Sequence, residues 1–209
     1  FSSFIEKTPS LGKTFLCIDD KNIKEVIKKT NNKNFYTYGL SKDANFNITN
    51  TLQKEKYSEF NLKIKIPGSK KEIKKIKIPL IGMHNIKNAA SCAAVAFLIG
   101  INDKTIKEGL KNFKGVQRRF NFLFKKNDAL FFDDYAHHPT EISSVLEGVK
   151  EVYKKKEIIC IFQPHRISRV KNLKFEFSRS FKKADTVILC PIYKAVSYTH
   201  LTLPTSHCV

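Results

Sequence analysis

The sequence predicts an α/β protein built from two parts. In the first part, short β-forming runs lead into an alternating polar and apolar stretch at 45–78, which is typical of antiparallel strands with one solvated face. In the second part, apolar runs alternate with helix-period segments, which is typical of a parallel sheet covered by helices. The Gly-containing segment 113–117 is the expected boundary between the two parts.

Local signals place the elements of the first part. Asp19 and Asp20 precede a helix-period run and predict its cap, while Pro67-Gly68 separates two alternating runs and predicts a hairpin. The expected elements are strands at 14–18 and 35–38, a helix at 21–29, antiparallel strands within 45–78, and helices at 89–99 and 103–112.

The second part places its polar residues in turns that follow strands. The expected elements are strands at 121–125 and 129–133, a helix at 140–153, a strand at 157–162, a helix ending near 183, and a strand at 186–190. Three polar turns, 134–138, 163–169 and 191–193, follow strands of this set. Because parallel strands end at one edge of a sheet, we expect the three turns to converge there and form a ligand site.

Composition narrows the class of protein. The 209 residues carry a formal charge of +19, but the charge is mostly lysine scattered over many segments, without interleaved aromatic residues. We therefore expect no nucleic-acid partner, although a basic RNA-binding module is the alternative that charge suggests. No apolar run is long enough for a membrane helix, so no membrane association is expected. Four of the five arginines are instead clustered, at 118–119 and 166–169, and a planar guanidinium is well suited to bind phosphate or carboxylate.

The turn after the 129–133 run gathers acids and histidines. Asp133, Asp134, His137, His138 and Glu141 lie within nine positions, where they can bind a ligand or simply cap the next helix. A metal-dependent hydrolase that uses the two histidines with Glu141 and one aspartate is an alternative from another class. Adjacent histidines in an extended turn point to opposite sides, which disfavours joint ligation, so no metal ligands are predicted.

A second candidate site is the start of the alanine-rich helix. His84 and Asn88 are four residues apart and share one face of a helical turn. An imidazole and an amide on one face can read the hydrogen-bonding edge of a purine. The alternative is that Asn85 or Asn88 merely caps the helix, and this stretch by itself favours the cap.

Four motifs together resemble the Mur ligases over residues 1–195. They are G-x-H-N-x-x-N at 82–88, G-V-x-R-R-F at 115–120, D-D-Y-A-H-H-P-T-E at 133–141 and F-Q-P-H-R-x-S-R at 162–169. The resemblance implies that 1–114 is the later part of the central ATP-binding domain, whose P-loop half lies upstream. It also implies that 115–195 is part of a Rossmann-like C-terminal ligase domain, both domains being truncated, and we interpret 196–209 as a non-native tail.

The resemblance also implies an activity. Mur ligases use ATP and Mg²⁺ in the bacterial cytoplasm, and the motifs match best a member that joins L-alanine to UDP-N-acetylmuramate through an acyl phosphate, in peptidoglycan synthesis. A ligase that recycles murein tripeptide is the alternative within the family. Gly12-Lys13-Thr14 is no phosphate loop because it lacks the earlier glycine and precedes a strand. With the P-loop and the magnesium ligands expected upstream, we expect the chain alone to be inactive. Its oligomeric state stays open.

Residue roles follow from the same resemblance. His84 and Asn88 would contact adenine, Asp134 the ribose, and Arg119, with Arg118, the phosphates of ATP. The residues expected to line the L-alanine and acyl-phosphate side are His137, His165, Arg166 and Arg169, with Tyr135 beside them.

Overall fold

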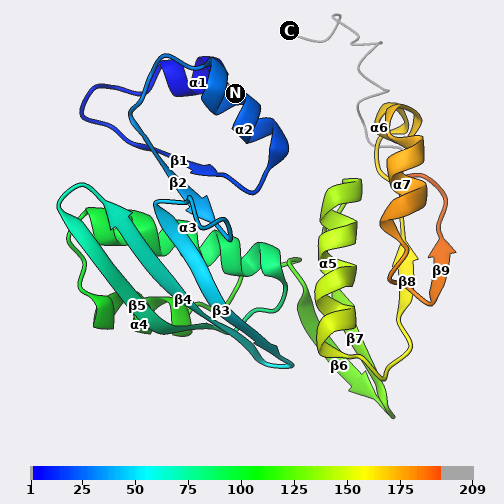
Figure 1. Ribbon diagram of the computed structural model, residues 1–209. Coiled ribbons are helices and arrows are strands. Elements are labelled where there is room, and N and C mark those ends of the chain that lie inside the picture. The colour runs from blue at the N-terminus through cyan, green and yellow to red at the C-terminus, as the bar shows by residue number, and fades with distance from the viewer. Residues whose placement is uncertain (1, 194–209) are drawn as a thin grey trace, which may run out of the picture. The chain divides into compact units, whose positions relative to one another are not determined.

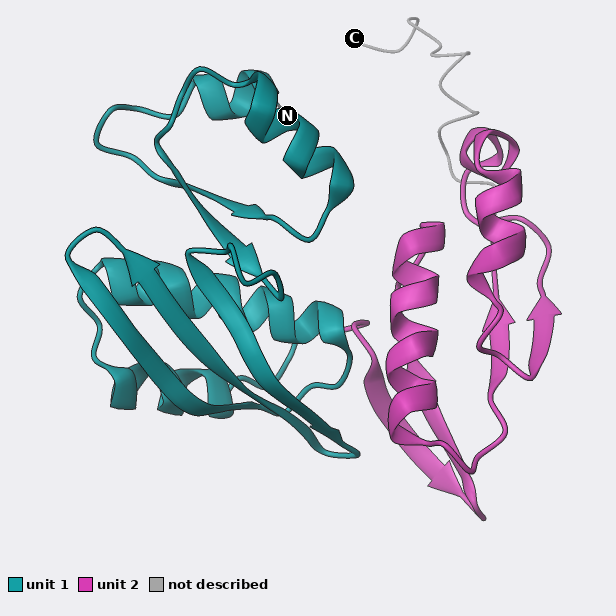
Figure 2. Cartoon of the chain, viewed as in Figure 1, with its two compact units in different colours: residues 1–115 teal, residues 116–209 magenta. Residues whose placement is uncertain are grey.

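The computed structural model describes residues 2–193 of the chain. It divides into two compact units, 1–115 and 116–209, and each is described by itself (Figure 2). The expected non-native tail, 196–209, lies outside the described residues. No helix among residues 2–193 is long and apolar enough to cross a membrane.

Unit 1 is organised around a mixed five-stranded sheet with the order β1-β2-β3-β4-β5 (Figure 1). The strands are β1 (Thr14–Cys17), β2 (Phe35–Gly39), β3 (Phe46–Lys54), β4 (Tyr57–Ile66) and β5 (Ser69–Ile78). The first two pairings are parallel, and the last two are antiparallel. The predicted hairpin is confirmed, because Pro67-Gly68 joins β4 to β5 with Gly68 at a φ of 76°.

Helices accompany this sheet. They are α1 (Ser2–Glu6), α2 (Lys21–Lys29), α3 (Met83–Leu98) and α4 (Asp103–Lys111). The predicted bounds of α2 are confirmed, and its cap is Asp20, whose carboxylate accepts hydrogen bonds from the N–H groups of Asn22 and Ile23. Helix α3 starts several residues earlier than expected, so His84 and Asn88 lie inside it.

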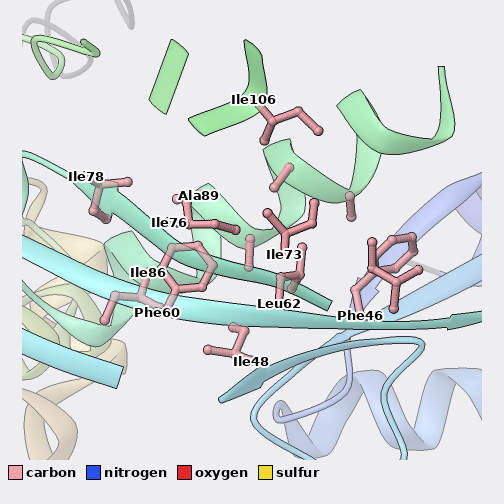
Figure 3. Packing of buried hydrophobic residues seen from close by; sticks show 14 residues of the cluster. Phe46, Ile48, Phe60, Leu62, Ile73, Ile76, Ile78, Ile86, Ala89 and Ile106 are labelled. Atoms are coloured by element: carbon pink, nitrogen blue, oxygen red, sulfur yellow. The ribbon is translucent and has the colours of Figure 1, made fainter. Parts of the chain in front are cut away.

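The core of unit 1 forms where α3 and α4 pack on the sheet (Figure 3). Phe60 and Leu62 of β4 are fully buried, and they meet the alanine face of α3, where Ala90 and Ala94 are also fully buried. Small side chains allow a helix to approach a sheet closely, which explains why the predicted alanine-rich helix packs here.

Within residues 116–193, unit 2 contains two separate two-stranded sheets with helices beside them (Figure 1). Its elements are β6 (Asn121–Lys126), β7 (Ala129–Asp133), α5 (Pro139–Val152), β8 (Ile159–Phe162), α6 (Ile167–Asn172), α7 (Lys174–Ser180) and β9 (Thr186–Leu189). The core joins Ile142 and Leu146 of α5 to Ile158, Phe162 and Phe177.

Two expectations for unit 2 are wrong in detail. We expected one parallel sheet, but β7 pairs antiparallel with β6 across a tight turn, and among residues 116–193 only β8 and β9 pair in parallel. Asn127 takes a φ of 52° in that turn, a left-handed conformation that asparagine tolerates and that favours a hairpin. The single helix expected up to residue 183 is instead α6 and α7, because the backbone breaks at Leu173.

Candidate functional site

The first turn of α3 presents His84 and Asn88. The helix has Gly82 as its N-cap with a φ of 97°, and no side chain caps it. The amide of Asn85 instead donates to the carbonyl of Ile81 at 2.7 Å, so the expectation that Asn85 or Asn88 caps the helix is wrong. Asn88 is exposed, while His84 is half-buried with its Nδ1 shielded from solvent. The two side chains therefore lie one helical turn apart, as predicted.

Gly82 leaves space for the His84 ring. A Cβ on Gly82 would lie 2.6 Å from Cε1 of His84, and the positive φ adds strain for any other residue. The N–H of Gly82 donates to Oε1 of Gln53 at 2.6 Å, which fixes this backbone against β3. The glycine in the motif thus places the imidazole at the start of the helix.

An ion pair anchors the same turn of α3, and sequence reasoning missed it. Nζ of Lys87 lies 2.9 Å from Oδ2 of Asp19, which follows β1. Asp19 also accepts hydrogen bonds from the N–H groups of Leu40 and Ser41. Burial opposes ionisation of this carboxyl, but these donors and the ammonium outweigh it and lower the pKa of Asp19 below its ordinary value. The sequence signal for this ion pair was the adjacent pair Asp19-Asp20. One aspartate is enough to cap α2, so the other was available for a different partner.

In unit 2, Asp134 connects two segments of backbone. Its Oδ2 accepts from the N–H of Phe120 at 2.7 Å, and its Oδ1 accepts from the N–H of Ala136 at 2.6 Å. The N–H of Tyr135 donates to the carbonyl of Arg118 at 2.8 Å. These bonds hold the arginine pair beside the acidic turn. A carboxylate has further lone pairs, so Asp134 can still accept from a ligand hydroxyl.

The two arginines have different partners. Nε of Arg118 lies 3.6 Å from Oδ2 of Asp133, and its guanidinium lies over the Tyr135 ring at 4.7 Å from the centroid. Nη1 of Arg119 lies 3.6 Å from Oε1 of Glu141. Both arginine side chains are more than half exposed, so their remaining N–H groups face solvent and are available to an anion.

The two histidines of the turn also differ. His138 is the N-cap of α5, with its Nδ1 accepting from the N–H of Thr140 and its own N–H donating to Glu141 in a capping box. His137 has Nδ1 at 2.9 Å from the carbonyl of Tyr135 and at 3.6 Å from Oε2 of Glu141. Burial opposes ionisation of Glu141, but the N–H and imidazole of His137, the N–H of His138 and Arg119 together lower its pKa.

These contacts bear on the metal alternative. Among residues 2–193 no group of three or more His, Cys, Asp and Glu side chains is placed to hold a metal ion. His138 uses its Nδ1 in the cap, which leaves only Nε2 of its ring for another partner. Among the described residues, no cluster of three such side chains supports the metal-dependent hydrolase alternative.

The turn after β8 lies beside the acidic turn. Nη1 of Arg169 donates to the carbonyl of His137 at 3.5 Å, and the His165 ring stacks on Tyr193 with centroids 5.5 Å apart. A backbone bridge also pairs His165 with Tyr193. Arg166 is exposed and begins α6 at a φ of 65°. The three polar turns of unit 2 are therefore linked by contacts, although β7 and β8 belong to different sheets.

Two features fall outside the candidate residues. Gly12-Lys13-Thr14 leads into β1, where Oγ1 of Thr14 lies 2.6 Å from that of Thr8, so it forms no loop before a helix. An apolar hollow of about 390 Å³ lies between β1, β2 and α3, and none of the candidate residues lines it.

Comparison with known families identifies both units. Residues 1–96 match the Mur ligase middle domain, and residues 118–201 match the Mur ligase glutamate ligase domain.

The chain belongs to the Mur ligase family.

Curated proteins similar in sequence to this chain include two ligases of one name. The chain is 59% identical over 196 residues to the UDP-N-acetylmuramate–L-alanine ligase of Pelagibacter ubique, covering 93% of this chain and 42% of that protein. It is 40% identical over 202 residues to the ligase of the same name from Brachyspira hyodysenteriae, covering 93% of the chain and 41% of that protein. The chain thus spans less than half the length of these relatives.

Solved structures show the same fold. The UDP-N-acetylmuramate–alanine ligase of Thermotoga maritima matches with a TM-score of 0.64 at 23% identity, over 94% of this chain and 49% of that one. A murein peptide ligase of Psychrobacter arcticus matches with a TM-score of 0.58 at 18% identity, over 99% and 48% of the two chains. The predicted fold class, Mur ligase middle and C-terminal domains in an α/β architecture, is confirmed.

Proposed function

We propose that this chain is part of an ATP-dependent ligase that joins L-alanine to the carboxylate of UDP-N-acetylmuramate through an acyl phosphate. The observation that carries the proposal is the 59% identity to a relative bearing that name, together with the cluster of cationic side chains around the 134–141 turn. Residues 1–114 would belong to the ATP-binding domain and residues 115–195 to the ligase domain. The enzyme would act in the bacterial cytoplasm, in peptidoglycan synthesis, with Mg²⁺ held outside the described residues.

The nucleotide roles suit the chemistry of the side chains. In this proposal His84 and Asn88 contact adenine, since a half-buried imidazole and an exposed amide one turn apart offer donors and acceptors in fixed positions. Asp134 accepts a ribose hydroxyl with the lone pairs that the backbone leaves free. Arg118 and Arg119 offer exposed guanidinium groups to phosphate oxygens.

The remaining cationic side chains of unit 2 can stabilise the negative charge that develops during acyl transfer. When an amine attacks an acyl phosphate, negative charge develops on oxygen, and fixed cationic donors stabilise it. Arg166, Arg169, His137 and His165 supply such donors on two linked turns, with Tyr135 beside them. A guanidinium also suits the carboxylate of the incoming L-alanine.

A hybrid protein tests the proposal. The matching 196-residue segment of the Pelagibacter ubique ligase is replaced by the corresponding residues of this chain. We expect the hybrid to release phosphate from ATP only when UDP-N-acetylmuramate and L-alanine are both present. Arg166→Lys should lower kcat/KM by about tenfold or more, because an ammonium cannot replace a planar fork, whereas Lys171→Arg on the exposed side of α6 should leave it unchanged. A hybrid that is folded and inactive would contradict the assignment.

Two further measurements separate the alternatives. Murein tripeptide as the preferred acceptor in a competition with L-alanine would favour the recycling ligase. The purified 209-residue chain alone should show no L-alanine-dependent hydrolysis of ATP, because no phosphate loop is found among its described residues. Measurable hydrolysis by the chain alone would overturn that expectation.

A further inference from the structure

Glu141 is a carboxylate of the acidic turn that meets both a candidate phosphate-binding residue, Arg119, and a candidate acyl-side residue, His137. It lies in the first turn of α5, and 35% of its side chain is exposed. Its two oxygens have separate tasks. Oε2 accepts from the N–H groups of His137 and His138 at 3.0 and 3.2 Å, while Oε1 faces Nη1 of Arg119 at 3.6 Å.

The backbone on either side of Arg119 is already held by other groups. The carbonyl of Arg118 accepts from Tyr135, and the N–H of Phe120 donates to Asp134. The Phe120 ring also stacks on Phe132 with centroids 4.3 Å apart. These contacts hold the backbone around Arg119 but do not orient its guanidinium. The charged group that contacts the guanidinium is the carboxylate of Glu141.

The helix cap does not require the negative charge of Glu141. A capping box requires an acceptor at this position, and glutamine supplies one as well as glutamate does. A carboxylate adds attraction for the Arg119 guanidinium and for a protonated His137. A glutamate at its ordinary pKa is already ionised at neutral pH, and these neighbours lower the pKa of Glu141 further.

We propose that Glu141 is a positioning residue that uses its negative charge to orient the guanidinium of Arg119 relative to His137. Its importance for catalysis rests on the proposed function, whereas its effect on Arg119 does not. Orientation matters because a small displacement of a group that binds a reacting phosphate lowers the rate strongly.

The first test uses the 209-residue chain itself, with Glu141→Gln and Glu141→Ala compared with Glu147→Gln, an exposed residue of the same helix. Nuclear magnetic resonance of the Arg119 side-chain Nε–H reports its order and exchange with solvent. We expect Glu141→Gln to raise the mobility of that group as much as Glu141→Ala does. The amides of His137 and His138 should stay protected in Glu141→Gln alone, and Glu147→Gln should change neither. An unchanged Arg119 signal in Glu141→Gln would overturn the proposal and leave Glu141 as a cap.

The second test measures rates in the hybrid. Glu141→Gln should lower kcat/KM for ATP about tenfold with little loss of thermal stability, while Glu147→Gln should match the parent hybrid. Wild-type rates in Glu141→Gln would show that orienting Arg119 has no catalytic value. An inactive parent hybrid with a responsive Arg119 would refute the proposed function and leave the orienting role in place.

Discussion

Single carboxylates determine the local shape of both candidate regions. Asp134 accepts from the N–H groups of Phe120 and Ala136. Asp19 accepts from the consecutive N–H groups of Leu40 and Ser41 and also pairs with Lys87 of α3. Such carboxylates are costly to remove, because the donors they satisfy lose their partners. Asp134, which we propose to accept a ribose hydroxyl, therefore also stabilises the fold.

Asp134→Ala should destabilise unit 2. The N–H groups of Phe120 and Ala136 would each lose a charge-assisted bond, which costs about 1–3 kcal/mol for each donor left without a partner. Urea unfolding, followed by circular dichroism, measures the change. Asp128→Ala, an exposed carboxylate in the turn between β6 and β7, is the control and should change little. Equal stability of the two variants would contradict this account.

Asp19 should make the stability of unit 1 depend on pH. Its pKa is lowered in the folded chain, so its contribution is present above the ordinary aspartate value of about 3.9 and is lost as the pH falls through the folded value. Asp19→Asn should be less stable at pH 7, and its free energy of unfolding should fall less between pH 5 and pH 3 (about the range in which carboxylates titrate). Urea titrations across this range measure it, with exposed Asp43→Asn as control. Parallel curves for Asp19→Asn and the parent would rule the linkage out.

Among the elements, α3 most clearly combines packing with placement of site residues. Its buried face is alanine, and its N-terminal turn carries His84, Lys87 and Asn88. Any shift of the helix on the sheet would move those side chains. The packing of α3 therefore controls the geometry of the first candidate region.

Ala93→Leu should disturb that packing. Ala93 is 1% exposed against the sheet, and extra methylenes in a filled core cost about 1–3 kcal/mol. Val95→Leu on the same helix, where the side chain is 41% exposed, is the matched control. Thermal unfolding should show a lower Tm for Ala93→Leu and an unchanged Tm for Val95→Leu. A tolerated leucine at 93 would mean that α3 can move away from the sheet.

Across the whole molecule, the two units have cores that share no residue. One core is formed by β3, β4, β5, α3 and α4, and the other by α5, β8, α7 and adjacent residues. Each unit buries enough apolar side chains to form a cluster of its own. A core mutation should therefore act mainly on the unit that contains it.

Paired core truncations test this independence. Phe60→Ala should cost about 3–5 kcal/mol and Leu146→Ala about 2–5 kcal/mol, each through a cavity in its own core. Hydrogen exchange of peptides from 46–78 and from 139–162 reports each unit separately. We expect loss of protection only in the mutated unit. Matching losses in both units from either mutation would show cooperative unfolding instead.

The sequence by itself determined what depends on neighbours along the chain. Residues 21–29 formed the predicted helix because Asp20 caps it, and Pro67-Gly68 formed the predicted hairpin because the turn chemistry is local. The motifs at 82–88, 115–120, 133–141 and 162–169 identified the Mur ligase family for the same reason, since short spacings are visible in sequence. The resemblance, and not periodicity, assigned roles to His84, Asn88, Arg119 and Asp134, and those roles stay predictions.

Only the tertiary structure decided which distant groups meet. β7 pairs with β6 and not with β8, because the left-handed turn at Asn127 closes a hairpin. The helix after β8 ends at Asn172, and a second helix follows Leu173. The Asp19–Lys87 pair joins residues 68 positions apart, and the contact of Arg119 with Glu141 crosses two strands. These two ion pairs depend on how strands and helices pack in space, and the sequence carries no local signal for them. Glu141, which caps α5, therefore meets Arg119 only because of the tertiary fold.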